Sequence, residues 1–142
     1  MSKRSPHLLW FRNELRTHDQ PLFRGLEASD QTAVGVWILD LNRHRGEVDG
    51  RIRTGSHRLA FLLQSVAVLR SSLRRLGSEL IIRVGDPAQI LPELANQLDA
   101  ASVRAVQAPG TEERLMETTV GARLGPIWRL EAAEGLFDNA DV

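Results

Sequence analysis

Short apolar runs alternate with longer amphipathic segments along most of the chain. Three runs have the length and composition of buried strands, and they span residues 7–11, 32–39 and 79–84. Two shorter runs of the same character follow at 103–106 and 126–130. Strands that alternate with helices indicate βαβ units with right-handed crossovers and a parallel sheet. The pattern therefore predicts a single α/β domain.

The strongest helical signal lies between residues 59 and 76. Apolar residues recur there at spacings of three and four, which predicts one buried helix face formed by Leu59, Leu62, Val66, Leu69, Leu73 and Leu76, widened by Ala60, Leu63 and Ala67. Gly77 stands where a helix is expected to stop. The polar segment 41–55 before this helix contains three glycines and four arginines, and we expect it to be a long loop.

Other helix starts are indicated by capping residues. Asp19 precedes Pro21, and Asp86 precedes Pro87, which places an acceptor at the N-cap and proline in the first turn. Asp86 is therefore expected to be a helix cap rather than a catalytic acid. Thr111 is expected to cap a further helix whose first turn carries two glutamates. The tryptophans lie in strand patterns, and we expect them in the core: Trp10, Trp37 and Trp128.

Composition narrows the class of protein. The 142 residues suit one domain, and 42% apolar with 25% charged residues is typical of a soluble globular chain. There is no cysteine, which excludes disulfides and thiolate metal sites and favours a cytoplasmic location. The 18 basic and 18 acidic side chains give no basic excess, and no apolar run is long enough to span a membrane. We therefore expect no direct binding to DNA or membranes.

Candidate chemistry is sought at the carboxyl ends of the strands, where open parallel sheets bind ligands. The loops that begin at Arg12, Asp40, Gly85 and Gln107 lie there. Neither the dinucleotide nor the P-loop glycine motif is present, and no histidine cluster or nucleophile–base pair is visible. No catalytic or metal-binding residue is predicted, and pattern alone indicates only an α/β domain with a ligand-binding edge.

Two motifs extend this interpretation. Residues 9–22 read Leu-Trp-Phe-Arg-Asn-Glu-Leu-Arg-Thr-His-Asp-Gln-Pro-Leu, which resembles the opening of photolyases and cryptochromes. Residues 54–66 resemble that family's Gly-x-x-Arg-x-x-Phe-Leu-x-x-Ser helix, and their Thr-Gly-x-His-Arg form is most similar to DASH-type cryptochromes. Residues 128–142 look like the start of the family's interdomain linker. The domain is thus expected at 1–130, with a linker or tail at 131–142.

The resemblance implies a Rossmann-like, doubly wound α/β fold with a five-stranded parallel sheet in the order 3-2-1-4-5. It also implies an antenna chromophore, which in this family is a folate, a deazaflavin or a flavin. The catalytic FAD and the pyrimidine-dimer pocket of the family lie in a separate helical domain, absent from this sequence. The implied function is therefore an accessory part of light-dependent DNA repair or blue-light sensing, not catalytic alone, with a helical FAD-binding domain as partner in cis or in trans.

The resemblance also implies site residues. Arg12 matches the arginine at the antenna cleft, and Trp37 and Asp40 end the second strand beside it. DASH-type relatives carry an Arg-Glu pair after the fourth strand, and its glutamate binds the folate pterin; Gln107 and Ala108 stand there here. Because alanine cannot replace a charged hydrogen bond, whose loss costs about 1.5–3 kcal/mol, this difference argues against folate.

Two kinds of alternative stay open at this point. Arg12 and Arg16 could have a structural role, in pairs with Glu14, Asp40 or the helical domain. The whole chain could also be a free-standing module of the same fold, which binds either a nucleotide-like ligand or another protein.

Overall fold

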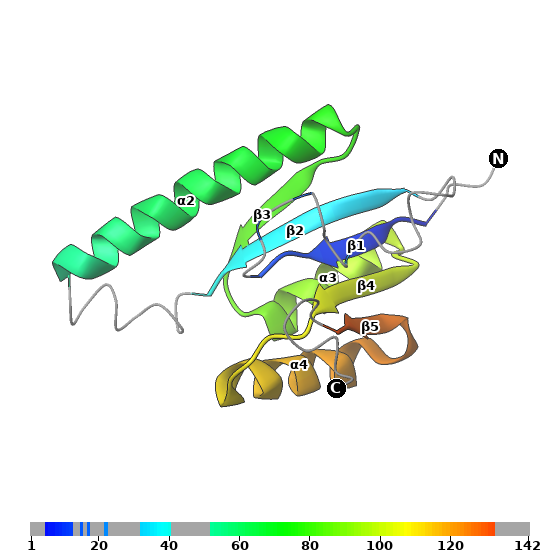
Figure 1. Ribbon diagram of the computed structural model, residues 1–142. Coiled ribbons are helices and arrows are strands. Elements are labelled where there is room, and N and C mark those ends of the chain that lie inside the picture. The colour runs from blue at the N-terminus through cyan, green and yellow to red at the C-terminus, as the bar shows by residue number, and fades with distance from the viewer. Residues whose placement is uncertain are drawn as a thin grey trace, which may run out of the picture.

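The computed structural model contains a five-stranded sheet with helices on both faces (Figure 1). It describes residues 5–12, 15, 17, 22, 32–40 and 52–132, with the backbone alone for residues 52–57. The strands are β1 (His7–Trp10), β2 (Ala33–Leu39), β3 (Leu80–Val84), β4 (Ser102–Val106) and β5 (Trp128–Glu131). The helices are α2 (Ile52–Arg75), α3 (Pro87–Leu98) and α4 (Thr111–Leu124), with a 3-10 turn at Gly125–Ile127.

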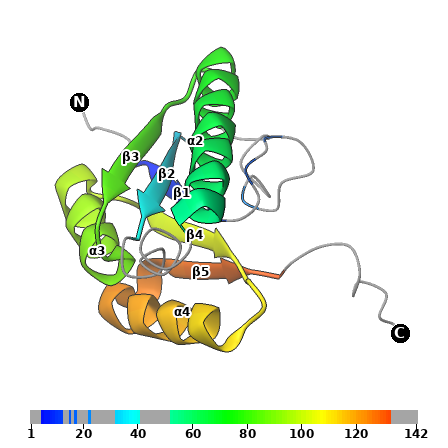
Figure 2. The ribbon, with the colours of Figure 1, turned by 90° about the vertical axis from the view of Figure 1, so that its left-hand side faces the viewer.

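The sheet is parallel throughout and has the order β3-β2-β1-β4-β5, which confirms the expected topology. The central strand β1 pairs with β2 on one side and β4 on the other, so that Leu9 lies between Gly35 and Arg104. Helix α2 covers one face of the sheet, and α3 and α4 cover the other (Figure 2). The strand order therefore reverses at β1, beside the carboxyl ends of β1 and β4.

The core has two halves, one on each face. Leu8 and Trp10 pack toward α3 and α4, whereas Leu9 and Phe11 pack toward α2. Because β1 is buried on both faces, its sequence is a continuous apolar run rather than an alternating one. The predicted core positions of Trp10 and Trp37 are confirmed, since each is 4% exposed. Trp128 is half-buried, with its ring centroid 6.3 Å from that of Trp10.

Helix α2 begins earlier than predicted. It starts at Ile52, so the last four residues of the predicted loop 41–55 are helical. Their polar composition suggested a loop, but an internal glycine such as Gly55 costs a helix only about 1 kcal/mol relative to alanine. Residues 41–51, and the helix predicted after Asp19, lie outside the described residues. Within the described ranges, no helix is both long and apolar enough to cross a membrane.

The buried face of α2 is narrower than predicted. Val66, Leu69 and Leu73 are buried as expected, but the residues predicted to complete or widen this face are exposed: Ala60, Leu63, Ala67 and Leu76. A helix on one face of a sheet buries a single stripe, and side chains beside that stripe stay in solvent. Gly77 ends the helix with a φ of 85°, as predicted.

The structure tests two of the predicted helix starts and the start of one predicted strand. The Asp86 carboxylate accepts a hydrogen bond from the N–H of Ala88 at 3.0 Å, which confirms the predicted cap. The prediction for Thr111 is wrong, because Gly110 is the N-cap and Thr111 the first helical residue. Gly110 has a φ of 112°, a conformation that side chains disfavour, so a glycine replaces the expected polar cap. Strand β5 starts at Trp128 rather than at residue 126, because a 3-10 turn precedes it.

Candidate functional site

The carboxyl ends of β1 and β4 form one edge at the centre of the sheet. Trp10 pairs with Ala105, so the segments that leave the two strands start side by side. The N–H of Phe11 still donates to the carbonyl of Val36 at 2.9 Å, and that of Gln107 to the carbonyl of Glu131 at 2.8 Å. The backbone is therefore held by sheet-like bonds up to the point where the candidate residues begin.

Arg12 follows β1 and turns toward α4. Its Nη1 lies 2.6 Å from Oε2 of Glu117, and its guanidinium carbon lies 4.7 Å from the ring centroid of Trp10. Weaker contacts of 3.4 Å reach the carbonyls of Val106 and Glu113. The side chain is 8% exposed, so this arginine is a buried cation that is held by a carboxylate, two carbonyls and an aromatic face.

Glu117 joins this arginine to the loop after β4. It is buried on α4, and its Oε2 accepts the N–H of Ala108 at 2.9 Å as well as the Arg12 contact. The carboxylate therefore bridges the exits of the two central strands. Sequence reasoning missed Glu117. The available signal was its place on the helix face of Val120, three residues further along, where a charged residue is rare unless it is paired.

The structure brings together two of the five predicted site residues. Arg12 and Ala108 share the carboxylate of Glu117, as described above. Trp37 lies in the core on the α2 face, Asp40 is half-buried at the end of β2, and the Gln107 side chain is exposed. Among the described residues Arg12 pairs with Glu117, a partner that the sequence did not suggest. Glu14 and Arg16 lie outside the described residues, so their pairing stays a prediction. The ligand-binding roles of all five stay predictions.

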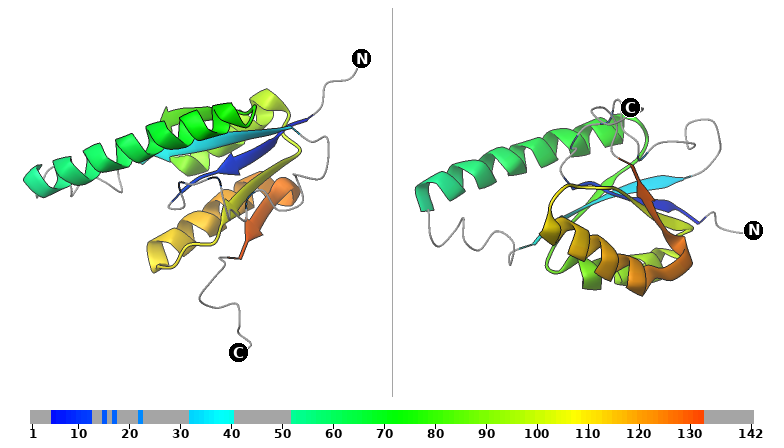
Figure 3. Two further views of the ribbon diagram at one scale, coloured as in Figure 1. Left: turned by 45° about the horizontal axis from the view of Figure 1, so that its top comes forward. Right: turned by 60° about the horizontal axis from the view of Figure 1, so that its bottom comes forward.

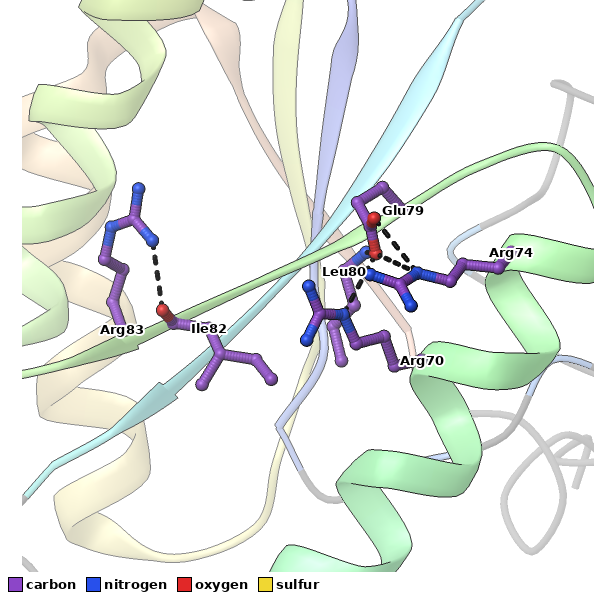
Figure 4. A network of polar contacts seen from close by, with 6 residues as sticks. All are labelled: Arg70, Arg74, Glu79, Leu80, Ile82 and Arg83. Atoms are coloured by element: carbon purple, nitrogen blue, oxygen red, sulfur yellow. Dashed lines mark hydrogen bonds and ion pairs between the residues drawn. The ribbon is translucent and has the colours of Figure 1, made fainter.

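A second polar cluster lies at the opposite, amino-terminal edge of the sheet (Figure 4). Glu79 precedes β3 and accepts from Nε of Arg74 at 3.0 Å and Nε of Arg70 at 3.1 Å. The N–H of Leu80 adds a bond of 2.9 Å. The hydrogen bond from Arg74, followed by those from Leu80 and Arg70, lowers the pKa of Glu79 from 4.5 to about 2. This cluster fixes the end of α2 to the start of β3, away from the candidate edge.

The described charged groups at the candidate edge are engaged in binding contacts. Its charged groups, Arg12 and Glu117, are paired with each other and with backbone atoms. Among the described residues, no three histidine, aspartate or glutamate side chains gather closely enough to bind a metal ion. The geometry suits a rigid platform at the switch point of an α/β sheet, which is where such folds place ligands.

Comparison with known proteins matches almost the whole chain to one family. The family model for DNA photolyase matches residues 7–131. A cryptochrome DASH of Natronomonas pharaonis is 39% identical over 117 residues, which are 82% of this chain and 25% of that relative. A deoxyribodipyrimidine photo-lyase of Halobacterium salinarum is 42% identical over 104 residues, covering 68% of this chain and 20% of that relative.

Solved structures show the same fold. A cryptochrome of Synechocystis sp. superposes with a TM-score of 0.73 at 28% identity, covering 95% of this chain and 28% of that one. An archaeal photolyase of Sulfolobus tokodaii, described with two FAD molecules and a novel light-harvesting cofactor, has a TM-score of 0.70 over 91% of this chain and 29% of its own. At 18% identity, this second likeness concerns the fold alone. The chain thus spans about a quarter of the length of these relatives.

Proposed function

Because the chain belongs to the DNA photolyase family, we propose that it is the antenna-chromophore-binding α/β part of a photolyase or cryptochrome. The observation that carries this proposal is the edge at which the exits of β1 and β4 meet. Arg12 and Ala108, two positions that the family resemblance assigns to the antenna cleft, are joined there by Glu117. This edge is also the switch point at which α/β sheets bind ligands.

The acceptors at this edge limit how strongly a chromophore ring can be held. Ala108 has no side-chain acceptor, and the carboxylate beside it already serves Arg12 and the Ala108 N–H. The exposed amide of Gln107 is the nearest side chain in sequence that can accept an N–H from a ring. We therefore expect a folate to bind weakly, because its carboxylate partner after β4 is missing, and a flavin or deazaflavin that offers a ring N–H there loses the same partner.

Absorbance tests the antenna role. The purified chain should show a ligand band in the near-ultraviolet or blue region, or acquire one when it is incubated with FAD, a deazaflavin or a reduced folate. Gln107→Ala should weaken binding by roughly two- to tenfold, the worth of one hydrogen bond. Leu115→Ala, on the exposed side of α4, is the matched control. A chain that takes up none of the three ligands would remove the antenna role.

The same proposal includes a partner. The relatives are about four to five times as long as the matched region, and we propose that a helical FAD-binding part, in cis or in trans, carries the photochemistry. The chain alone is then expected to leave pyrimidine-dimer DNA unrepaired under blue light. Repair by the isolated chain would contradict the proposal that the partner carries the photochemistry.

A further inference from the structure

The two outermost strands of the sheet each pair with only one other strand. In the order β3-β2-β1-β4-β5, these strands are β3 and β5, and no strand among the described residues pairs with the outer edge of either (Figures 1 and 3). An open strand edge carries unpaired N–H and C=O groups, which can bind a strand of another molecule. The contacts of these outward groups therefore decide whether the chain can associate through its sheet.

The register of the sheet identifies the backbone groups that point outward. The N–H of Gly85 donates to the carbonyl of Leu39 on β2, and the N–H of Gln107 donates to the carbonyl of Glu131 on β5. Along a strand, consecutive residues direct their backbone groups to opposite sides, so the odd-numbered residues of β3 and β5 bond to the sheet. The outward residues are therefore Leu80, Ile82 and Val84 on β3, and Trp128 and Leu130 on β5.

Side chains occupy two of the outward groups of β3 (Figure 4). Nη1 of Arg83 donates to the carbonyl of Ile82 at 3.0 Å, and Oε1 of Glu79 accepts the N–H of Leu80 at 2.9 Å. An incoming antiparallel strand exchanges two hydrogen bonds with every second residue of the strand that it joins. Leu80 and Ile82 each have one of these two groups already bonded, which leaves Val84 as the outward residue of β3 with both groups available.

The other outer edge has the same arrangement. Nη1 of Arg129 donates to the outward carbonyl of Trp128 at 3.2 Å, and to the carbonyl of Pro126 at 2.6 Å. On both outermost strands, an exposed arginine thus donates to the outward carbonyl of the residue before it. We call Arg83 and Arg129 the edge arginines. A strand that joins either edge must displace a guanidinium from a carbonyl, and it must also take that charge out of water.

Without the edge arginines, both outer edges would suit strand addition. Their side chains include Ile82, Val84 and Leu130, which are 38%, 58% and 40% exposed. Apolar and β-branched residues on an open edge favour pairing with another strand. A second copy of this chain supplies such a strand, because β3 set antiparallel against β3 of another copy repeats the same contacts across a twofold axis.

We propose that the edge arginines, together with Glu79 on β3, prevent the sheet of this chain from pairing with the sheet of a second copy. Each arginine occupies a carbonyl that such a pair would need, and the Glu79 carboxylate occupies an N–H. The inference is independent of the antenna proposal, because the outer edges of β3 and β5 lie apart from the ends of β1 and β4.

Sedimentation velocity over a range of protein concentrations tests the proposal. The test variant combines Arg83→Ser with Arg129→Ser, because serine is polar but has no guanidinium to place on the carbonyl. The matched control combines Arg75→Ser with Arg114→Ser, which removes the same charge from exposed positions on α2 and α4. The test variant should associate at least roughly tenfold more tightly than the wild type and the control, because two like strands gain the two freed carbonyls when they pair. Equal association of the test variant and the control would overturn the proposal.

Amide hydrogen exchange locates the contact. The outward N–H groups of Val84 and Leu130 should become protected as the concentration of the test variant rises. Association without this protection would place the contact elsewhere, for example on the exposed apolar side of α2, and would also overturn the proposal.

The single variants keep the test readable if the double variant does not fold, which circular dichroism reports. Arg83→Ser alone should protect the N–H of Val84, and Arg129→Ser alone should protect that of Leu130. If both single variants fold and show neither effect, the proposal is wrong.

Discussion

The ion pair of Arg12 and Glu117 contributes to the stability of the domain because it is buried. Both side chains are more than nine-tenths buried, so water screens their attraction only weakly. Removing one member would leave the other charge uncompensated, which typically costs about 3–5 kcal/mol. The pair is therefore expected to position the loop after β4 as much as to stabilise the domain.

Substitutions at this pair should be strongly non-additive. Glu117→Gln keeps an acceptor for the Ala108 N–H but removes the charge, and we expect the free energy of unfolding to fall by about 3 kcal/mol. Arg12→Met combined with Glu117→Leu should cost less than the sum of the single changes, because neither charge is left unpaired. Urea denaturation measures all the variants, and additive losses would contradict a coupled pair.

Glu79 should make stability depend on pH in the acidic range. Its pKa is lowered from the ordinary value of 4.5 to about 2 by folding, so the stabilisation is complete above pH 4.5 and is lost as pH falls toward 2. Glu79→Gln should flatten this part of the profile. Arg74→Gln should do so partly, whereas Arg75→Gln, whose guanidinium contacts Ser72 instead, should leave it as it was. Thermal melts across this pH window provide the comparison.

At the scale of elements, the sequence predicted every described strand and the three principal helices. Buried parallel strands leave continuous apolar runs, and a helix on a sheet leaves a period near 3.6, so both are visible without a structure. The start of α2 at Ile52 and the cap at Gly110 were missed. Those boundaries depend on backbone conformation, which residue composition reports only weakly.

The contact of α2 with the sheet depends on Gly35. A Cβ there would lie 2.8 Å from Cδ1 of Leu73 and 3.0 Å from atoms of Leu80 and Phe11, all buried. Gly35→Ala should therefore lower the free energy of unfolding by about 1–3 kcal/mol through overpacking. In the background Leu73→Ala, the same change should cost less, because the nearest methyl is gone. Chemical denaturation of the four proteins tests this, and equal costs in both backgrounds would refute the clash.

At the scale of the whole molecule, only part of the candidate site could be predicted from the sequence. Arg12 and Ala108 were indicated by family motifs in two separate segments. Glu117 was not, because its role arises only when α4 packs under the switch point and brings together residues 105 positions apart. A buried carboxylate on a helix can be recognised only when the structure shows which face of the helix packs against the sheet.

The exposed apolar side chains of α2, Phe61 at 71% and Val68 at 65%, should govern how the isolated chain behaves in solution. Phe61→Ser with Val68→Ser should raise solubility and lower the binding of a hydrophobic dye. The melting temperature should stay nearly unchanged, since surface substitutions usually shift stability by less than about 0.5 kcal/mol. Leu115→Ser serves as the control on α4, with a similar exposed fraction of 63%. A large drop in melting temperature would show that these side chains support the fold itself.

The position of β1 at the centre of the sheet affects how the chain folds during its synthesis. His7 meets Ser102 across a separation of 95 residues, and their side chains lie 2.6 Å apart. During synthesis on the ribosome, β1 can pair with β2 early, but its other edge has no strand to join until β4 has left the exit tunnel. That open edge is apolar on both faces and prone to non-native pairing. Translation pauses before β4 has left the exit tunnel should therefore favour aggregation, whereas later pauses should be harmless.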